Sequence, residues 1–148
     1  MKIISKEEAQ IWCHHHHIAM NDRGLPERRD FPTKFDIPVD AGQRVYLVSE
    51  RMSAFREEPS LLVWFDDWSV WPYGQRMHIF ERLRLSYGET RRLIDSPGHV
   101  FESAEIEDAI SFVTLAVLFL WDCYVLTPER RKLLYFSHDE FGLTNSVV

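Results

Sequence analysis

Leu61 to Tyr73 read LLVWFDDWSVWPY, and we expect the fold to be organised around this stretch. Leu61–Phe65 is a continuous apolar run of strand length, which is typical of a strand that is buried on both faces. We expect Asp66 and Asp67 to turn or bulge the chain, and Trp68–Trp71 to return as a short second strand before the proline that follows. The stretch therefore predicts the centre of a sheet.

The composition predicts one globular domain covering residues 1–148. A chain of 148 residues buries enough surface to fold without disulfide staples. The hydrophobic content of 45% and the charged content of 27% are ordinary, whereas 14% aromatic residues is high. The net charge of −6 argues against nonspecific nucleic-acid binding, which requires Lys and Arg to neutralise phosphates, and it permits a basic partner.

The cysteines and the apolar segments predict a cytoplasmic protein. Cys13 and Cys123 form no CxxC pair, so a reducing compartment is the default, although a single bridge between them stays open. The first ten residues, MKIISKEEAQ, show no signal-peptide pattern. The apolar run Ala109–Trp121 is shorter than the roughly 20 residues that a spanning helix needs, so we expect a buried helix and no membrane association.

Helices are predicted in four regions. Ser5 and Glu8 have the spacing of a capping box, and the helix that they begin is expected to extend to Met20. Asp40 begins a second helix with an apolar stripe, although a strand over Arg44–Ser49 is the competing interpretation. The other two helices are expected over residues 74–87 and 103–121.

Three strands complete the predicted fold. Tyr124–Leu126 and Leu133–Ser137 are close enough in sequence to form a hairpin, and Leu61–Phe65 would join them. The region between the first two helices is expected to be irregular apart from an extended piece at Lys34–Ile37, and the tail from Leu143 is expected to be loose. The fold class that follows is α+β, with about four helices packed on a small three- to four-stranded mixed sheet.

The first candidate site is an acidic and aromatic surface formed by Trp64, Asp66, Asp67, Trp68 and Trp71. Aromatic rings supply contact area at low entropic cost and carboxylates supply orientation, so this combination is typical of a docking surface for a basic partner. The alternative is a turn between buried strands, with the tryptophans in the core.

The second candidate site is a metal site that involves the histidine run at residues 14–17. On a helix, His14 and His17 lie on one face, which suits a divalent metal such as zinc. A third ligand must come from elsewhere, and His138 is the candidate that we select. The alternative is one packed histidine, His16, with the other three facing solvent.

The segment Ser137–Glu140 places a histidine beside two carboxylates at the end of a predicted strand, where catalytic groups often lie. Because neighbouring residues of a strand point to opposite faces, we expect His138 to share a face with Glu140 and not with Asp139. The alternative is that these polar residues have no catalytic role and only mark the point where the strand ends and the chain leaves the sheet. The sequence contains no G-x-S-x-G, H-E-x-x-H, P-loop or G-x-G-x-x-G pattern, so enzymatic activity is not predicted.

Three segments of the second half carry a resemblance. They read VWPYGQRMHIFERLRLSYGETRRLIDSPGHVF from Val70, LFLWDCYVL from Leu118 and LLYFSHDEF from Leu133. Together they resemble a group of small, uncharacterised bacterial proteins. The resemblance implies a bacterial, cytoplasmic, single-domain protein, and it implies no activity, substrate or catalytic residue.

The sequence supports three functional hypotheses. The leading one is a non-enzymatic binding or protein-interaction module that uses the acidic and aromatic surface. The second is a metal-dependent hydrolase with a histidine and carboxylate site. The third is a homo-oligomeric structural protein, in which exposed aromatic residues form the interface between copies.

Overall fold

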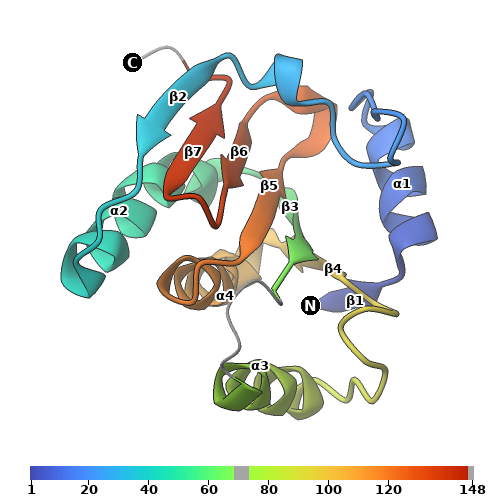
Figure 1. The fold of residues 1–148 in the computed structure, drawn as a ribbon. Helices are drawn as coiled ribbons and strands as arrows, with labels where there is room; N and C mark the ends of the chain where they lie inside the picture. Colours follow the sequence, from blue (N-terminus) through green and yellow to red (C-terminus); the bar gives the residue numbers. More distant parts are fainter. Residues whose placement is uncertain (69–73, 147–148) are drawn as a thin grey trace.

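The computed structural model describes residues 1–68 and 74–146, with the side chains of residues 74–77 outside that description. Within these ranges the chain forms an antiparallel sheet with helices on both faces (Figure 1). The helices are α1 (Lys6–His15), α2 (Ala41–Ser53), α3 (Gly74–Ser86) and α4 (Ile106–Leu118). The strands are β1 (Lys2–Ile4), β2 (Thr33–Asp36), β3 (Ser60–Asp67), β4 (Gly98–Glu102), β5 (Asp122–Leu126), β6 (Leu133–Phe136) and β7 (Phe141–Thr144).

The sheet is larger than the sequence predicts, and it is not mixed. In the described part of the chain it has seven strands in the order β1-β4-β3-β5-β6-β7-β2, and each recorded pairing is antiparallel. The predicted α+β class is confirmed, but the predicted three- to four-stranded mixed sheet is wrong. The strands that the sequence did not predict or left uncertain, β1, β2, β4 and β7, have three to five residues and lack the apolar run that marks β3. Short, half-exposed strands leave only a weak signal in the sequence because their pairing depends on distant partners.

Two core clusters explain why the central strands are apolar throughout. Val63 and Phe65 of β3 face the cluster under α2 and α4, whereas Leu62 and Trp64 face the cluster under α1. Alternate residues of a strand point to opposite faces, so a strand covered on both sides must be apolar at every position. The prediction of a doubly buried strand at Leu61–Phe65 is therefore confirmed.

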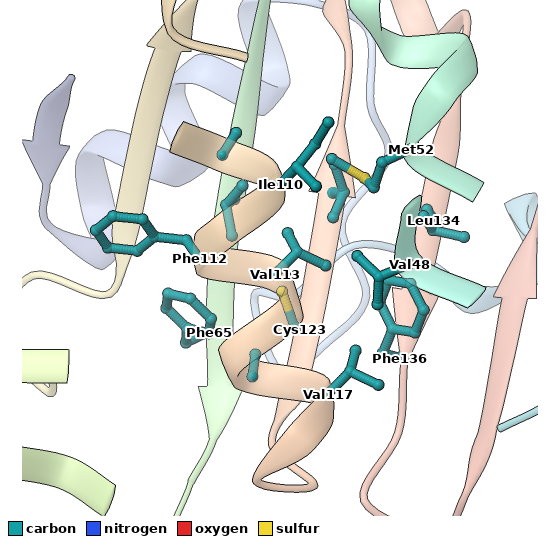
Figure 2. Close-up of a cluster of buried hydrophobic side chains, with 14 of the residues drawn as sticks. Val48, Met52, Phe65, Ile110, Phe112, Val113, Val117, Cys123, Leu134 and Phe136 are labelled. Carbon is teal, nitrogen blue, oxygen red and sulfur yellow. The ribbon is translucent and has the colours of Figure 1, made fainter. Parts of the chain in front are cut away.

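Helix α4 is the centre of the larger cluster, as predicted (Figure 2). Val113 and Val117 point from α4 toward the sheet and lie near Cys123 of β5 and Phe136 of β6. The helix ends at Leu118, and Leu120 adopts a positive φ of 56° that reverses the chain into β5. Among the described residues, no helix has the length and apolar character that a membrane crossing requires.

The first helix begins as predicted but ends earlier. The capping box between Ser5 and Glu8 is present, yet α1 stops at His15 instead of reaching Met20. His17 adopts a positive φ of 60°, and the N–H of Ile18 donates to the carbonyl of Cys13 at 2.8 Å. This left-handed turn closes the helix and sends the following segment back over the sheet.

The predicted second helix is confirmed, and the competing strand over Arg44–Ser49 is not formed. Asp40 accepts a hydrogen bond from the N–H of Gln43 at 2.8 Å and caps α2. Val48 and Met52 lie fully buried in the larger cluster. At the other end of the chain, the predicted loose tail is wrong for Leu143 and Thr144, because they belong to β7, which pairs with both β6 and β2. Residues 147–148 lie outside the described residues.

Candidate functional site

A β-bulge at the end of β3 places two aspartates opposite one residue of β5. Phe65 pairs with Cys123 and Asp67 pairs with Asp122, so the register shifts between Phe65 and Asp67 and leaves Asp66 as the extra residue. Bulges of this kind redirect side chains at the margins of sheets. The prediction that Asp66 and Asp67 would turn or bulge the chain is confirmed as a bulge.

Asp122 and His138 meet beside this bulge. Asp122 is the first residue of β5 and is 4% exposed, while His138 follows the end of β6. The Oδ1 atom of Asp122 lies 2.7 Å from the backbone nitrogen of His138 and 2.8 Å from its Nδ1 atom. Burial acts to lower the pKa of His138, but the hydrogen bond and the charge of Asp122 outweigh it, so the pKa lies above its ordinary value.

The structure corrects the expectation for Asp139. We expected His138 and Asp139 to point to opposite faces, yet the Nε2 atom of His138 lies 3.4 Å from an Asp139 carboxylate oxygen. The strand β6 ends at Phe136, so both residues lie in the turn that follows, where strand alternation no longer applies. His138 therefore has one buried and one exposed carboxylate as neighbours.

One side of the site, next to the aspartates, is formed by Arg28 and two tyrosines. The Nη2 atom of Arg28 donates to the hydroxyl of Tyr135 at 2.7 Å, and the guanidinium also lies over the Tyr135 ring at 4.5 Å from its centre. The rings of Tyr124 and Tyr135 are neighbours, with centroids 4.6 Å apart. Burial raises the pKa of both phenols, so these side chains stay neutral.

Two pockets adjoin at Asp66 and Asp67. We call them the small pocket and the large pocket, with volumes of about 280 and 450 Å³. The small pocket is lined by Arg23, Arg28, Asp66, Asp67, Asp122, Tyr135, Ser137, His138 and Asp139. The large pocket is lined by Asp66, Asp67, Trp68, Glu81, Arg92, Leu93 and Ile94.

The electrostatics of the small pocket favour a cationic ligand. Four of its lining residues are aspartates and two are arginines, so the carboxylates are in excess. Burial, together with the charge of Asp122, raises the pKa of Asp66. A raised carboxyl pKa means that the ionised form is poorly compensated, and an incoming cation would compensate it.

Three side chains of the small pocket have the geometry of a metal site. One ligand atom each from Asp67, Asp122 and His138 lie within 4.8 Å of one another. Two carboxylates and one imidazole form a donor set that suits zinc and other divalent transition metals. The residues come from β3, β5 and the turn after β6, which are neighbours in the sheet.

The tryptophans of the predicted docking surface lie in different environments. Trp64 is 1% exposed and packs in the core beside Tyr124, so it does not contribute to a surface. Trp68 is half-buried, packs against the larger core cluster and lines the large pocket. Trp71 lies outside the described residues.

The predicted metal ligands are not brought together. The Nε2 atom of His17 lies 3.5 Å from Glu129, which follows the C-terminal end of β5. His138 lies beside Asp122 at the opposite end of β5, and His14 is an exposed residue of α1. Five strand residues span roughly 14 Å, so His17 and His138 are separated by the length of the strand. His16 is partly buried against Trp12, with ring centroids 4.4 Å apart.

Sequence reasoning missed four residues that line the small pocket, namely Arg23, Arg28, Asp122 and Tyr135. Asp122 had a signal, because it is an acidic residue inside the apolar run from Leu118 to Leu126. A carboxylate in such a run is rarely buried without a partner. Arg28 lies in a segment without periodicity and had no comparable signal.

Comparison with known proteins gives no assignment for this arrangement. No protein-family model, no curated protein and no solved structure matches the chain.

Proposed function

We propose that the protein is a non-enzymatic interaction module that binds a basic side chain of a partner protein at the acidic end of β3. The observation that carries the proposal is the shared wall of the two pockets. Asp66 and Asp67 line both pockets, and Trp68 lies beside them. A partner that reaches this wall meets carboxylates on either side of the bulge.

The chemistry of the wall suits an arginine of the partner. A guanidinium forms charge-assisted hydrogen bonds with carboxylates and stacks on aromatic rings, and both groups are present here. Three residues that line the large pocket are acidic and one is an arginine, Arg92, which is engaged with Asp95 at 2.9 Å. The net charge of −6 adds long-range attraction for a basic partner.

The experiment compares an arginine-rich peptide with a glutamate-rich peptide of the same length by fluorescence anisotropy at fixed ionic strength. We expect the arginine-rich peptide alone to bind. In the double variant Asp67→Ala/Trp68→Ala, affinity should fall by more than about 30-fold, which corresponds to the ~2 kcal/mol of an interface hot spot. A pull-down from native lysate with the same variant then identifies the natural partner.

The matched control is Glu7→Gln, which removes one negative charge from the exposed first turn of α1. If the control weakens binding as much as the double variant, binding depends on net charge and not on this wall. Unchanged affinity in a folded double variant excludes the wall as the contact surface. Sedimentation on the same samples shows whether a second copy of the chain occupies the site instead.

The second candidate function is a metal-dependent hydrolase, and one observation favours it. Asp67, Asp122 and His138 present ligand atoms within 4.8 Å of one another. A divalent metal held there would lower the pKa of its bound water and supply a nucleophile near neutral pH. The residues needed for such chemistry therefore come from the small pocket and not from the histidine run.

Metal analysis of protein prepared without an affinity tag tests this second candidate. After purification in the presence of added zinc, wild-type protein should retain close to one equivalent, and Asp122→Asn should retain far less. Less than about 0.1 equivalent in the wild type argues against a metal enzyme, because a site of this kind holds its metal tightly. Equal content in the wild type and the variant would place the metal elsewhere.

We also propose that the protein works in a bacterial cytoplasm, as the resemblance of the second half implies. Two free cysteines support a reducing compartment. Cys13 and Cys123 are buried in different core clusters, on opposite faces of the sheet. Burial raises the pKa of the Cys13 thiol to about 12, so this side chain is not a reactive thiolate.

A further inference from the structure

Arg84 of α3 is a buried cation with unused hydrogen-bond donors. Its side chain is 2% exposed, and its Nη2 atom donates to the Ser96 carbonyl at 2.9 Å and to the Ser96 hydroxyl. Its Nε and Nη1 atoms have no hydrogen-bond partner among the described residues and almost no contact with solvent. Burial lowers the pKa of this guanidinium, which means that the charged form is poorly compensated.

Glu89 is the acidic residue whose charge acts most strongly on Arg84, but its carboxylate is hydrogen-bonded to a different arginine. The negative charge of Glu89 acts on the pKa of Arg84 by Coulombic interaction alone. Both Glu89 carboxylate oxygens are engaged by Arg91, whose Nε and Nη2 atoms each lie 2.9 Å from one of them. A buried guanidinium without a bonded anion costs several kcal/mol, so its retention requires an explanation.

Arg84 lines a pocket of about 410 Å³ that we call the arginine pocket. Three arginines and two glutamates line this pocket, but Arg91 is paired with Glu89 and Arg92 with Asp95, so Arg84 is the arginine of this wall without a bonded carboxylate among the described residues. The exposed side chains of Leu85 and Thr90 lie on the solvent side of this pocket. The full lining is Glu81, Arg84, Leu85, Glu89, Thr90, Arg91 and Arg92.

We propose that the arginine pocket binds a small molecule with a phosphate or carboxylate group, and that Arg84 supplies the hydrogen bonds that hold it. Guanidinium groups recognise both anions through charge-assisted hydrogen bonds. An anion bound in this pocket compensates the buried charge of Arg84. The proposal does not rest on the function proposed for β3, since it concerns an anion and not a cation.

The test measures thermal stability and affinity at constant ionic strength with inorganic phosphate and, separately, with succinate. The variants are Arg84→Met and, as a matched control, Arg82→Met, which removes an exposed arginine of the same helix. We expect phosphate, succinate or both to raise Tm in the wild type and in Arg82→Met. The dissociation constant should rise at least ten-fold in Arg84→Met. The probe with the larger effect identifies the preferred anion class.

Two outcomes overturn the proposal. One is that neither anion raises the Tm of the wild type at millimolar concentration. The other is an equal response in Arg84→Met, which would mean an adventitious ion only. If Arg84→Met does not fold, NMR of the wild type decides, because the Arg84 Nε–H resonance must shift on anion binding. An unchanged resonance at saturating anion also overturns the proposal.

Discussion

One carboxylate oxygen of Asp122 accepts two hydrogen bonds from His138, at 2.7 Å from the backbone nitrogen and 2.8 Å from Nδ1. Because an ionised carboxylate only accepts, the Nδ1 atom must carry the proton. The Nε2 atom is therefore the one that is free to titrate or to bind a metal. Its nearest recorded neighbour is Asp139, at 3.4 Å and largely exposed.

The first prediction concerns the pKa of His138. Replacing Asp122 with asparagine should lower this pKa toward its ordinary value or below, because the charge that outweighs the effect of burial is removed. The measurement is an NMR titration of the His138 ring proton. Glu129→Gln, which alters a carboxylate next to His16 and His17, should leave the pKa of His138 unchanged. An unaltered pKa in Asp122→Asn would mean that another group sets it.

The same pair makes stability depend on pH in a defined direction. A histidine with a raised pKa in the folded state binds its proton more tightly there than in the unfolded chain. Its stabilising effect is complete below the ordinary value of 6.5 and disappears as the pH rises through the raised value. The free-energy gap between wild type and His138→Gln should therefore be wider at pH 6 than at pH 8 in urea unfolding. A gap that widens toward alkaline pH would contradict this prediction.

His99 should have the opposite effect. Burial, reinforced by the charge of Arg84, lowers the pKa of His99 from 6.5 to about 3. The unfolded chain then binds one proton more than the folded protein between these values, so His99 lowers stability as the pH falls below 6.5, by on the order of 1 kcal/mol per pH unit. We expect His99→Leu to lose less stability than the wild type between pH 6.5 and pH 4. Parallel curves for the two proteins would show that the pKa of His99 is not lowered in the folded state.

The fourth prediction concerns the attachment of α3. Phe80 is 0% exposed and its ring lies 4.8 Å from Phe65, 5.2 Å from Phe112 and 4.8 Å from Trp121. Phe80→Ala should reduce the free energy of unfolding by about 3–5 kcal/mol, because it leaves a cavity among these rings. Chemical denaturation measures the loss. Ile79→Ala on the same helix, where Ile79 is 45% exposed, should change stability much less. Similar losses for both variants would mean that α3 packs through another face.

The fifth prediction concerns the outermost strand. A methyl group at Gly142 of β7 would overlap the ring of Phe35 on β2. Gly142→Ala should therefore destabilise the protein by about 1–3 kcal/mol, the usual cost of overpacking. Amide hydrogen exchange should show loss of protection in β2. Adding Phe35→Leu should restore part of the stability, and if the double variant is less stable than Gly142→Ala alone, the overlap is not the cause.

Local signals were sufficient wherever neighbours in the sequence make the contacts. The helix caps at Ser5 and Asp40 lie at the observed helix starts, since their hydrogen bonds reach only three residues along the chain. The length and apolar character of Leu61–Phe65 correctly indicated burial on both faces. The end of α1 was placed too late because the turn at His17 is stabilised by packing of the segment that follows, and not by a glycine.

The candidate site depended on contacts that the sequence does not record. Asp66 and Asp67 were identified, but Asp122 lies 55 residues further along and joins them only through the register of β3 with β5. His138 was predicted to bind a metal together with the histidines at residues 14–17, because no local pattern specifies near which end of β5 it lies. Trp64 was assigned to the surface because two aspartates follow it closely, whereas β3 is covered on both faces and Trp64 packs in the core cluster under α1.

The sequence by itself determined the α+β class, the four helices, the central buried strand and the acidic bulge, because each depends on propensity and patterning over a few residues. The tertiary structure alone decided the seven-strand order, the pairing of β7 and β2, and the meeting of Asp67, Asp122 and His138. Strand pairing joins residues far apart in the chain, and a shift of one residue in register moves every side chain to the other face. The chemistry of the site therefore depends on the register between strands, which no short stretch of the sequence specifies.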